Sequence, residues 1–180
     1  MCIRDRDAPH QLFGHDGWTN NVISLHSFSK DLAIPGYRVG AIVAAPAVLY
    51  EALKLIDCMQ ICAPRIGQEA VLCGLREAQA WRAAQTERVR GAQHVFERVM
   101  AGRPGGFELV SVGAFFGWVR HPFTDLDTGE VIKRLVLDHD VLAIPGTAFT
   151  PTDERWIRFS FANLPPDDLQ ELGRRLSAMS

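Results

Sequence analysis

The amino-acid sequence predicts a mixed α/β protein that is organised in two parts along the chain. Two short apolar runs rich in β-branched residues, followed by long stretches with helical spacing, predict strands and helices in the first part. A glycine- and proline-rich segment, Gly102 to Gly106, then precedes a second set of short strands and helices. The order of these later elements predicts an α+β layer arrangement.

The strands of the first part are predicted at Asn21 to His26 and Arg38 to Ala44, because each run is apolar and bounded by glycine, proline or polar residues. A loop, Ser27 to Tyr37, is expected to join them. Pro46 to Met59 predicts a helix, since proline suits the first turn and apolar side chains recur at helical spacing. From Ile66 to Met100 the spacing is helical again and fits either one long helix or two in succession.

The second part is predicted as strand, strand, helix, strand, strand and helix. These elements are expected at Phe107 to Val110, Phe115 to His121, Gly129 to Asp138, Val141 to Ile144, Trp156 to Phe161 and Pro166 to Ala178. Asp127 followed by Glu130 is typical of a capping box at the start of the middle helix. In the last helix, four apolar side chains at helical spacing are expected to pack onto the sheet: Leu169, Leu172, Leu176 and Met179.

The composition is that of an ordinary folded protein, and a small-molecule substrate is the default expectation. The 180 residues suffice for one core, or for one small domain plus a piece of another. Apolar residues make up 47% and charged residues 22%. A net charge of -2 gives no general attraction to nucleic acid or anionic lipid. The longest apolar runs fall short of the ~20 residues that span a bilayer.

No metal site is expected, because the candidate ligands lack a ligand pattern. The histidines are scattered at His10, His15, His26, His94, His121 and His139. The cysteines show no paired CxxC spacing, and they are expected to be buried, reduced thiols, which fits a cytoplasmic protein: Cys2, Cys58, Cys62 and Cys73. A serine hydrolase is disfavoured because no serine stands in a G-x-S-x-G elbow.

One segment between the first two predicted strands carries a motif. It reads Ser27-Phe28-Ser29-Lys30, and a turn containing Pro35 and Gly36 leads to Arg38 eight residues after the lysine. This motif, together with the strand that follows it, resembles the cofactor-lysine region of class I and II aminotransferases, which are fold-type I enzymes dependent on pyridoxal phosphate. The resemblance extends from about Asp7 to the C-terminus.

The resemblance also covers Ile144-Pro145-Gly146 and Trp156-Ile157-Arg158-Phe159-Ser160. It implies the C-terminal part of the fold-type I transferase fold, with the end of the large cofactor-binding domain and its connecting helices in residues 7–90. A small α+β C-terminal domain is expected in residues 91–180. Residues 1–6 (MCIRDR) look like a non-native start, so we expect the chain to be a fragment of a longer protein.

The resemblance implies a role for each motif residue. Lys30 is expected to hold pyridoxal 5'-phosphate through a Schiff base and to move a proton at the substrate α-carbon. Ser27, Ser29 and Arg38 are expected to bind the cofactor phosphate. Arg158 is expected to receive the substrate α-carboxylate through a planar two-bond pairing, with the neighbouring Arg155 as a competitor for that role.

The implied activity is transfer of an α-amino group from an amino acid to a 2-oxo acid, by a protein that is a homodimer when complete. The alternatives are a sensor domain of a transcriptional regulator, a carbon-sulfur lyase or a decarboxylating or condensing enzyme of the same fold, and a non-catalytic remnant. The donor and acceptor are not indicated. Four aromatic side chains are expected in the core rather than lining an apolar wall: Phe13, Phe115, Phe116 and Phe149.

The sequence departs from the family pattern upstream of the lysine. The family's aspartate at the pyridine nitrogen, its tyrosine and asparagine at the ring hydroxyl and its glycine-containing phosphate turn cannot be located here. Asp5 and Asp7 are not assigned the aspartate's role, because the start of the chain looks foreign. Since that aspartate keeps the ring able to accept electrons, this chain alone is expected to be inactive.

Overall fold

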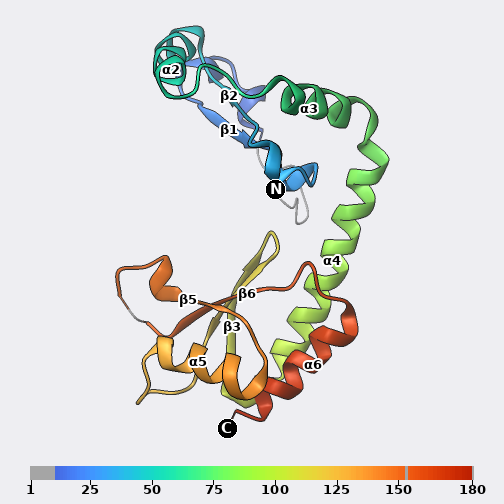
Figure 1. Cartoon of the computed structure of the whole chain (residues 1–180), viewed down its shortest axis with the longest axis vertical. Coiled ribbons are helices and arrows are strands. Elements are labelled where there is room, and N and C mark those ends of the chain that lie inside the picture. The colour runs from blue at the N-terminus through green and yellow to red at the C-terminus, as the bar shows by residue number, and fades with distance from the viewer. Residues whose placement is uncertain (1–10, 153, 180) are drawn as a thin grey trace. The chain divides into compact units, whose positions relative to one another are not determined.

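The computed structural model describes residues 11–152 and 154–179, and the chain divides into two compact units, residues 1–84 and 85–180 (Figure 1). The division falls within helix α4 (Gln79–Ala101). The expected domain boundary, after residue 90, lies in the same helix. The assignment of the two segments to a large and a small domain stays a prediction, as does the non-native start, which lies outside the described residues.

The first unit contains an antiparallel pair of strands, β1 (Ser24–Ser27) and β2 (Gly40–Val43). Both predicted strands are therefore present, with shifted ends. The predicted loop between them instead contains a four-residue helix, α1 (Phe28–Asp31), and a 3₁₀ turn, Pro35–Tyr37. One helical turn is too short to show apolar periodicity, so this pattern gave no signal in the sequence.

Helices follow the second strand of this unit. Helix α2 (Pro46–Met59) has the predicted bounds, with proline at its first position, where a missing N–H removes no hydrogen bond. The long helical stretch forms two helices, α3 (Arg65–Glu77) and α4, with Ala78 between them. The buried cluster of this unit is small and consists of Leu32, Val39 and Val71.

The second unit contains a four-stranded antiparallel sheet in the order β3-β4-β6-β5. Its strands are β3 (Glu108–Gly113), β4 (Phe116–Arg120), β5 (Ile144–Pro145) and β6 (Trp156–Ser160), and its further helices are α5 (Thr128–His139) and α6 (Pro166–Ser177). The predicted order of elements is confirmed. The strand predicted from Val141 is wrong over most of its length, because the Val141 N–H donates to the Leu135 oxygen at 2.8 Å and closes helix α5.

One face of this sheet packs against helices. Val119, Ile157 and Phe159 are buried and alternate with less buried neighbours along β4 and β6, and the ring of Phe159 lies 6.4 Å from that of Phe96 on α4. Gly117 lies where a Cβ would overlap the ring of Phe96, so α4 packs directly on β4. The remaining core of this unit includes these buried apolar side chains: Met100, Phe107, Val131, Leu135, Phe161, Leu169, Leu172 and Leu176.

Two local predictions in this unit are confirmed. The Asp127 carboxylate accepts a hydrogen bond from the Glu130 N–H at 2.8 Å, which caps helix α5. The four apolar side chains of the last helical segment are all buried, as expected for a face that packs on the sheet: Leu169, Leu172, Leu176 and Met179.

The cysteine prediction is wrong where the structure tests it. Cys58, Cys62 and Cys73 are free thiols, but all three are exposed. They belong to the first unit, whose helices α2 and α3 bury few side chains. The low polarity of a cysteine side chain is therefore not enough to bury it in this unit. Cys2 lies outside the described residues. Across the described ranges, none of the helices combines the length and the low polarity needed to cross a bilayer.

Candidate functional site

The predicted cofactor lysine lies directly beyond the end of strand β1. Ser27 is the last residue of the strand and Lys30 lies in the single turn of α1, with an exposed side chain. Ser27 is opposite Gly40 in the strand pair, and the Phe28 N–H donates to the Val39 oxygen at 3.3 Å. The lysine segment therefore runs beside the segment that carries Arg38.

Helix α3 fixes both of these segments by close packing at two glycines. A Cβ at Gly67 would lie 2.5 Å from Cγ2 of Val39, and one at Gly74 would lie 2.8 Å from Cδ1 of Leu32. Each glycine thus leaves room for one buried side chain of the lysine and arginine segments. Leu32 follows the lysine turn and Val39 follows Arg38, so apolar packing holds the motif at both ends.

An ion pair holds the lysine turn from a third direction. Arg82 in helix α4 donates from Nη2 to Oδ2 of Asp31 at 2.6 Å and from Nε to Oδ1 at 3.2 Å. This two-bond geometry restricts rotation of the carboxylate, and Asp31 is the residue next to Lys30. The backbone that carries the lysine is therefore tied to α4 as well as to α3.

The side chains predicted to bind the cofactor phosphate have hydrogen-bonding capacity to spare. Ser27 precedes α1 with an extended backbone, and its hydroxyl makes no capping bond. Arg38 adopts a left-handed backbone conformation at φ 52° and donates from Nη1 to the Pro35 oxygen at 3.0 Å. Within the described ranges, its other donors and the hydroxyls of Ser27 and Ser29 have no hydrogen-bond partner. The motif can thus supply two hydroxyls and a guanidinium to an anion.

Arg158 lies in the second unit, on the face of the sheet opposite the helices. It stands on β6 and is paired with Trp118 on β4 and with Ile144 on β5. Its Cζ lies 4.1 Å from the ring centre of Phe116 and 4.2 Å from that of Phe149. In the part of the chain that the structure describes, the guanidinium forms no hydrogen bond or ion pair, so all of its N–H donors remain available.

The competing arginine is used locally. Arg155 has a left-handed backbone at φ 63°, and its Nη1 donates to the Pro122 oxygen at 3.3 Å. Its own backbone oxygen accepts from the His121 N–H at 3.0 Å. Arg155 therefore links the start of β6 to the end of β4. Of the two arginines, Arg158 is the better candidate to bind a ligand.

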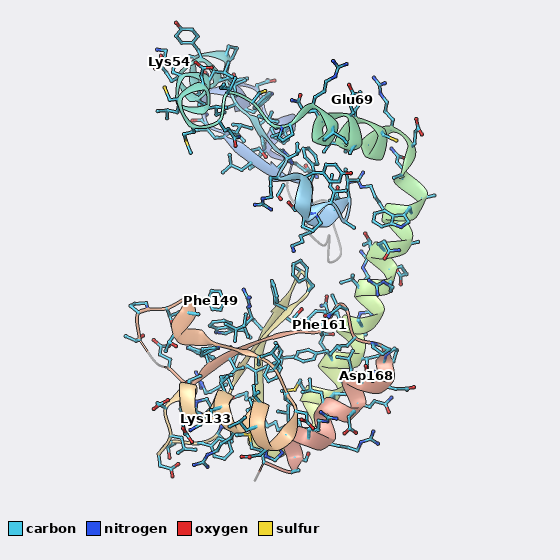
Figure 2. All side chains as sticks on the ribbon, viewed as in Figure 1. Lys54, Glu69, Lys133, Phe149, Phe161 and Asp168 are labelled. Carbon is cyan, nitrogen blue, oxygen red and sulfur yellow. The ribbon has the colours of Figure 1, made fainter. Side chains whose placement is uncertain are left out.

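The phenylalanines beside Arg158 were missed by sequence reasoning. Phe116 is half-buried and 49% of Phe149 is exposed, so the expectation that they belong to the core is wrong. Figure 2 shows Phe149 beyond β5, away from the buried Phe161. Phe13 is exposed and Phe115 is half-buried, so neither lies in the core. The contacts of Phe116 and Phe149 with Arg158 depend on how the strands pair, and the local sequence pattern does not specify that pairing.

The described residues do not bring a set of metal ligands together. No group of three or more histidine, cysteine, aspartate or glutamate side chains is close enough to hold an ion there. The structure thus brings Ser27, Ser29, Lys30 and Arg38 into one segment of the first unit and puts Arg158 in the second.

The chain is similar to known aminotransferases. The family model described as aminotransferase class I and II matches residues 2–176. An aspartate aminotransferase from Pyrococcus abyssi is 27% identical over 163 residues, covering 89% of this chain and 41% of that protein. The aromatic aminotransferase ISS1 from Arabidopsis thaliana is 29% identical over 182 residues, covering 94% of this chain and 45% of that protein.

A solved structure matches as well. LysN, an α-aminoadipate aminotransferase from Thermus thermophilus in complex with N-(5'-phosphopyridoxyl)-L-leucine, superposes with a TM-score of 0.79 at 26% identity. The match covers 99% of this chain and 46% of LysN. This chain therefore spans less than half the length of the proteins it matches. With a fold-type I architecture and a family model that matches nearly all of its residues, the chain belongs to the aminotransferase class I and II family.

Proposed function

We propose that this chain is the C-terminal part of an aminotransferase that moves an α-amino group from an amino acid to a 2-oxo acid. Members of its family generally use pyridoxal phosphate, and the lysine segment is the observation that carries the proposal. Its backbone is held at Asp31, Leu32 and Val39, while Lys30 is presented at the surface of the unit. A fixed backbone and an accessible amine are what covalent attachment of an aldehyde cofactor requires.

The residues of the motif fit the cofactor's phosphate. Phosphate needs several fixed donors and a positive charge, and the hydroxyls of Ser27 and Ser29 and the guanidinium of Arg38 supply both. These groups have donors that no described residue uses. The bond from Arg38 to the Pro35 oxygen orients the guanidinium without neutralising it.

Two residues of this chain would act on the substrate. When bound, pyridoxal phosphate supplies an aldehyde and an electron-accepting ring. The amine of Lys30 would take a proton from the α-carbon of the amino-acid donor in the first half of the exchange, and would give a proton to the α-carbon derived from the 2-oxo acid in the second half. The donors of Arg158 would bind both oxygens of the α-carboxylate, which orients the α-carbon for that transfer.

The proposal includes a cytoplasmic homodimer with small-molecule substrates. Family membership supports the homodimer and the small-molecule substrates. The net charge of -2 gives no general attraction to nucleic acid or lipid. Light scattering coupled to size exclusion, on the full open reading frame that contains these residues, is expected to give twice the mass of one chain. A monomer at micromolar concentration would remove the homodimer from the proposal and leave the activity open.

The activity is tested by absorbance spectroscopy on the same full open reading frame. With pyridoxal phosphate the protein is expected to show the band of a lysine-bound cofactor, and particular amino acids are expected to bleach it. The Lys30→Ala variant should lack the band. A band that no amino acid changes would favour a ligand sensor, and an unchanged band in Lys30→Ala would show that Lys30 is not the attachment site.

A further inference from the structure

Aromatic rings cover two sides of the Arg158 guanidinium. The ring centres of Phe116 and Phe149 each lie within 4.2 Å of Cζ, yet these two rings, both described, make no ring contact with each other. They therefore cover different sides of the cation. We propose that Phe116 and Phe149 are positioning residues that hold the plane of Arg158 ready for a planar carboxylate, an inference that rests on the proposed function.

The hydrogen-bonding state of Arg158 explains why such a clamp is needed. A half-buried arginine is usually oriented by hydrogen bonds or an ion pair, and Arg158 has neither among the described residues. A guanidinium presents its five N–H donors around the edge of a flat group, whereas its faces stack on aromatic rings. Rings 4.1 and 4.2 Å from Cζ restrict the guanidinium, and no described residue uses its N–H donors, which stay available for two-bond pairing with a carboxylate.

The clamp also lowers the entropic cost of binding. A free arginine side chain loses rotamer freedom when it pairs with a ligand, and that loss weakens binding. The contacts with Phe116 and Phe149 restrict the side chain before the ligand arrives, and each such contact is favourable in itself. Loss of either ring should therefore weaken carboxylate binding more than it slows chemistry.

The two rings are themselves held in place. Phe116 packs against Phe115 with a centroid distance of 4.3 Å, and Phe149 meets Trp118 edge to face at 5.9 Å. The Phe149 N–H donates to the Gly146 oxygen at 2.8 Å, in the turn after β5. A Cβ at Gly146 would lie 2.5 Å from Cβ of Trp156, so this turn lies tightly against β6. Backbone and ring contacts thus fix Phe149 relative to Arg158.

The test uses steady-state kinetics on the full open reading frame loaded with pyridoxal phosphate. Phe116→Leu and Phe149→Leu should each raise KM for the amino-acid donor roughly fivefold, with kcat changed less than about twofold. Phe149→Tyr should restore the parent KM, because its ring keeps the stacking surface. Phe123→Leu is the matched control: its ring contacts Phe107 and His121 rather than Arg158, and KM should not change.

A double-mutant cycle with Arg158→Gln separates this inference from the proposed function. Arg158→Gln should raise KM far more than either leucine variant, and Phe149→Leu should add nothing in that background. A fivefold effect of Phe149→Leu that persists without the arginine, or the absence of any effect beside an active Arg158, would overturn the clamp and leave the proposed function standing. An unchanged KM in Arg158→Gln would overturn both.

Discussion

The two units of the chain bury their apolar side chains to different extents. In the second unit, Phe96, Phe107 and Phe161 are fully buried between helices and one face of the sheet. In the first unit, Leu25 on β1 is 74% exposed and Met59 at the end of α2 is 83% exposed. The second unit thus closes its own core, whereas the first presents apolar surface that no described residue of that unit covers.

This difference bears on the candidate site. The lysine segment belongs to the unit with the smaller core, yet it is held locally by the α3 glycines and the Asp31–Arg82 pair. Burial elsewhere in the first unit contributes little to that local order. The precision of the lysine turn should therefore depend on a few named contacts, whereas the stability of the second unit should depend on its whole core.

Expression of the two units as separate fragments should show the largest effect. Residues 85–180 are expected to unfold cooperatively with heat, because their apolar side chains are buried within the unit. Residues 11–84 are expected to bind a dye for apolar surface and to lack a sharp transition. Circular dichroism and dye fluorescence check both. Cooperative melting of both fragments would show that the first unit needs no further cover.

Truncation of one core ring is the next largest effect. Phe96→Ala should reduce the free energy of unfolding of fragment 85–180 by about 3–5 kcal/mol, because Phe96 is fully buried and stacks on Phe161 at 5.1 Å. Leu142→Ala, at a side chain 83% exposed, should change it by less than about 0.5 kcal/mol. Chemical denaturation measures both. Equal effects would contradict the assignment of the core.

A smaller effect is expected at the ion pair beside the lysine. Asp31→Asn should weaken cofactor binding and lower stability by about 1 kcal/mol, because one charge of a two-bond pair is lost at side chains about one-third exposed. Titration of pyridoxal phosphate into the full open reading frame measures the affinity. Lys54→Gln, which removes an exposed pair with Glu51, is the control and should have no effect. Equal affinities in all three proteins would show that the pair does not position the lysine turn.

The smallest effect concerns pH in the second unit. Hydrogen bonds from Arg175 and then Arg174 lower the pKa of Glu171 below its ordinary value of 4.5. A lowered folded-state pKa stabilises the protein above the unfolded-state value, and this stability is lost as pH falls from about 4.5 through the folded-state pKa. Glu171→Gln should therefore melt slightly below the parent fragment at pH 7 and match it in strong acid. A difference that grows in acid would contradict the assigned sign.

Elements with a repeating pattern could be predicted from the sequence. Helix α2 has the expected bounds because Pro46 marks its start and its apolar residues recur at helical spacing. The four-residue α1 is too short to show a repeating pattern. The strand predicted from Val141 does not form at that residue, because its N–H caps helix α5 instead. The places where prediction failed are thus set by single hydrogen bonds and by very short segments.

The candidate site, too, could be predicted only in part. Lys30, Arg38 and Arg158 could be picked out because motif spacing and flanking strands are local properties of the sequence. The clamp on Arg158 could not, because Phe116 and Phe149 meet it through the pairing of β4 with β6 and through the turn after β5. Contacts between separate strands depend on register, which no local pattern in this chain specifies.

The most direct test of the proposed function is to find which lysine binds the cofactor. The full open reading frame would be incubated with pyridoxal phosphate, reduced with borohydride, digested and analysed by mass spectrometry. Among the residues printed here the chain has three lysines, and Lys54 and Lys133, both labelled in Figure 2, pair with Glu51 and Glu130. We expect the cofactor's mass on the peptide that contains Lys30. Labelling of Lys54 or Lys133 instead, or of no lysine in this chain, would contradict the proposed function.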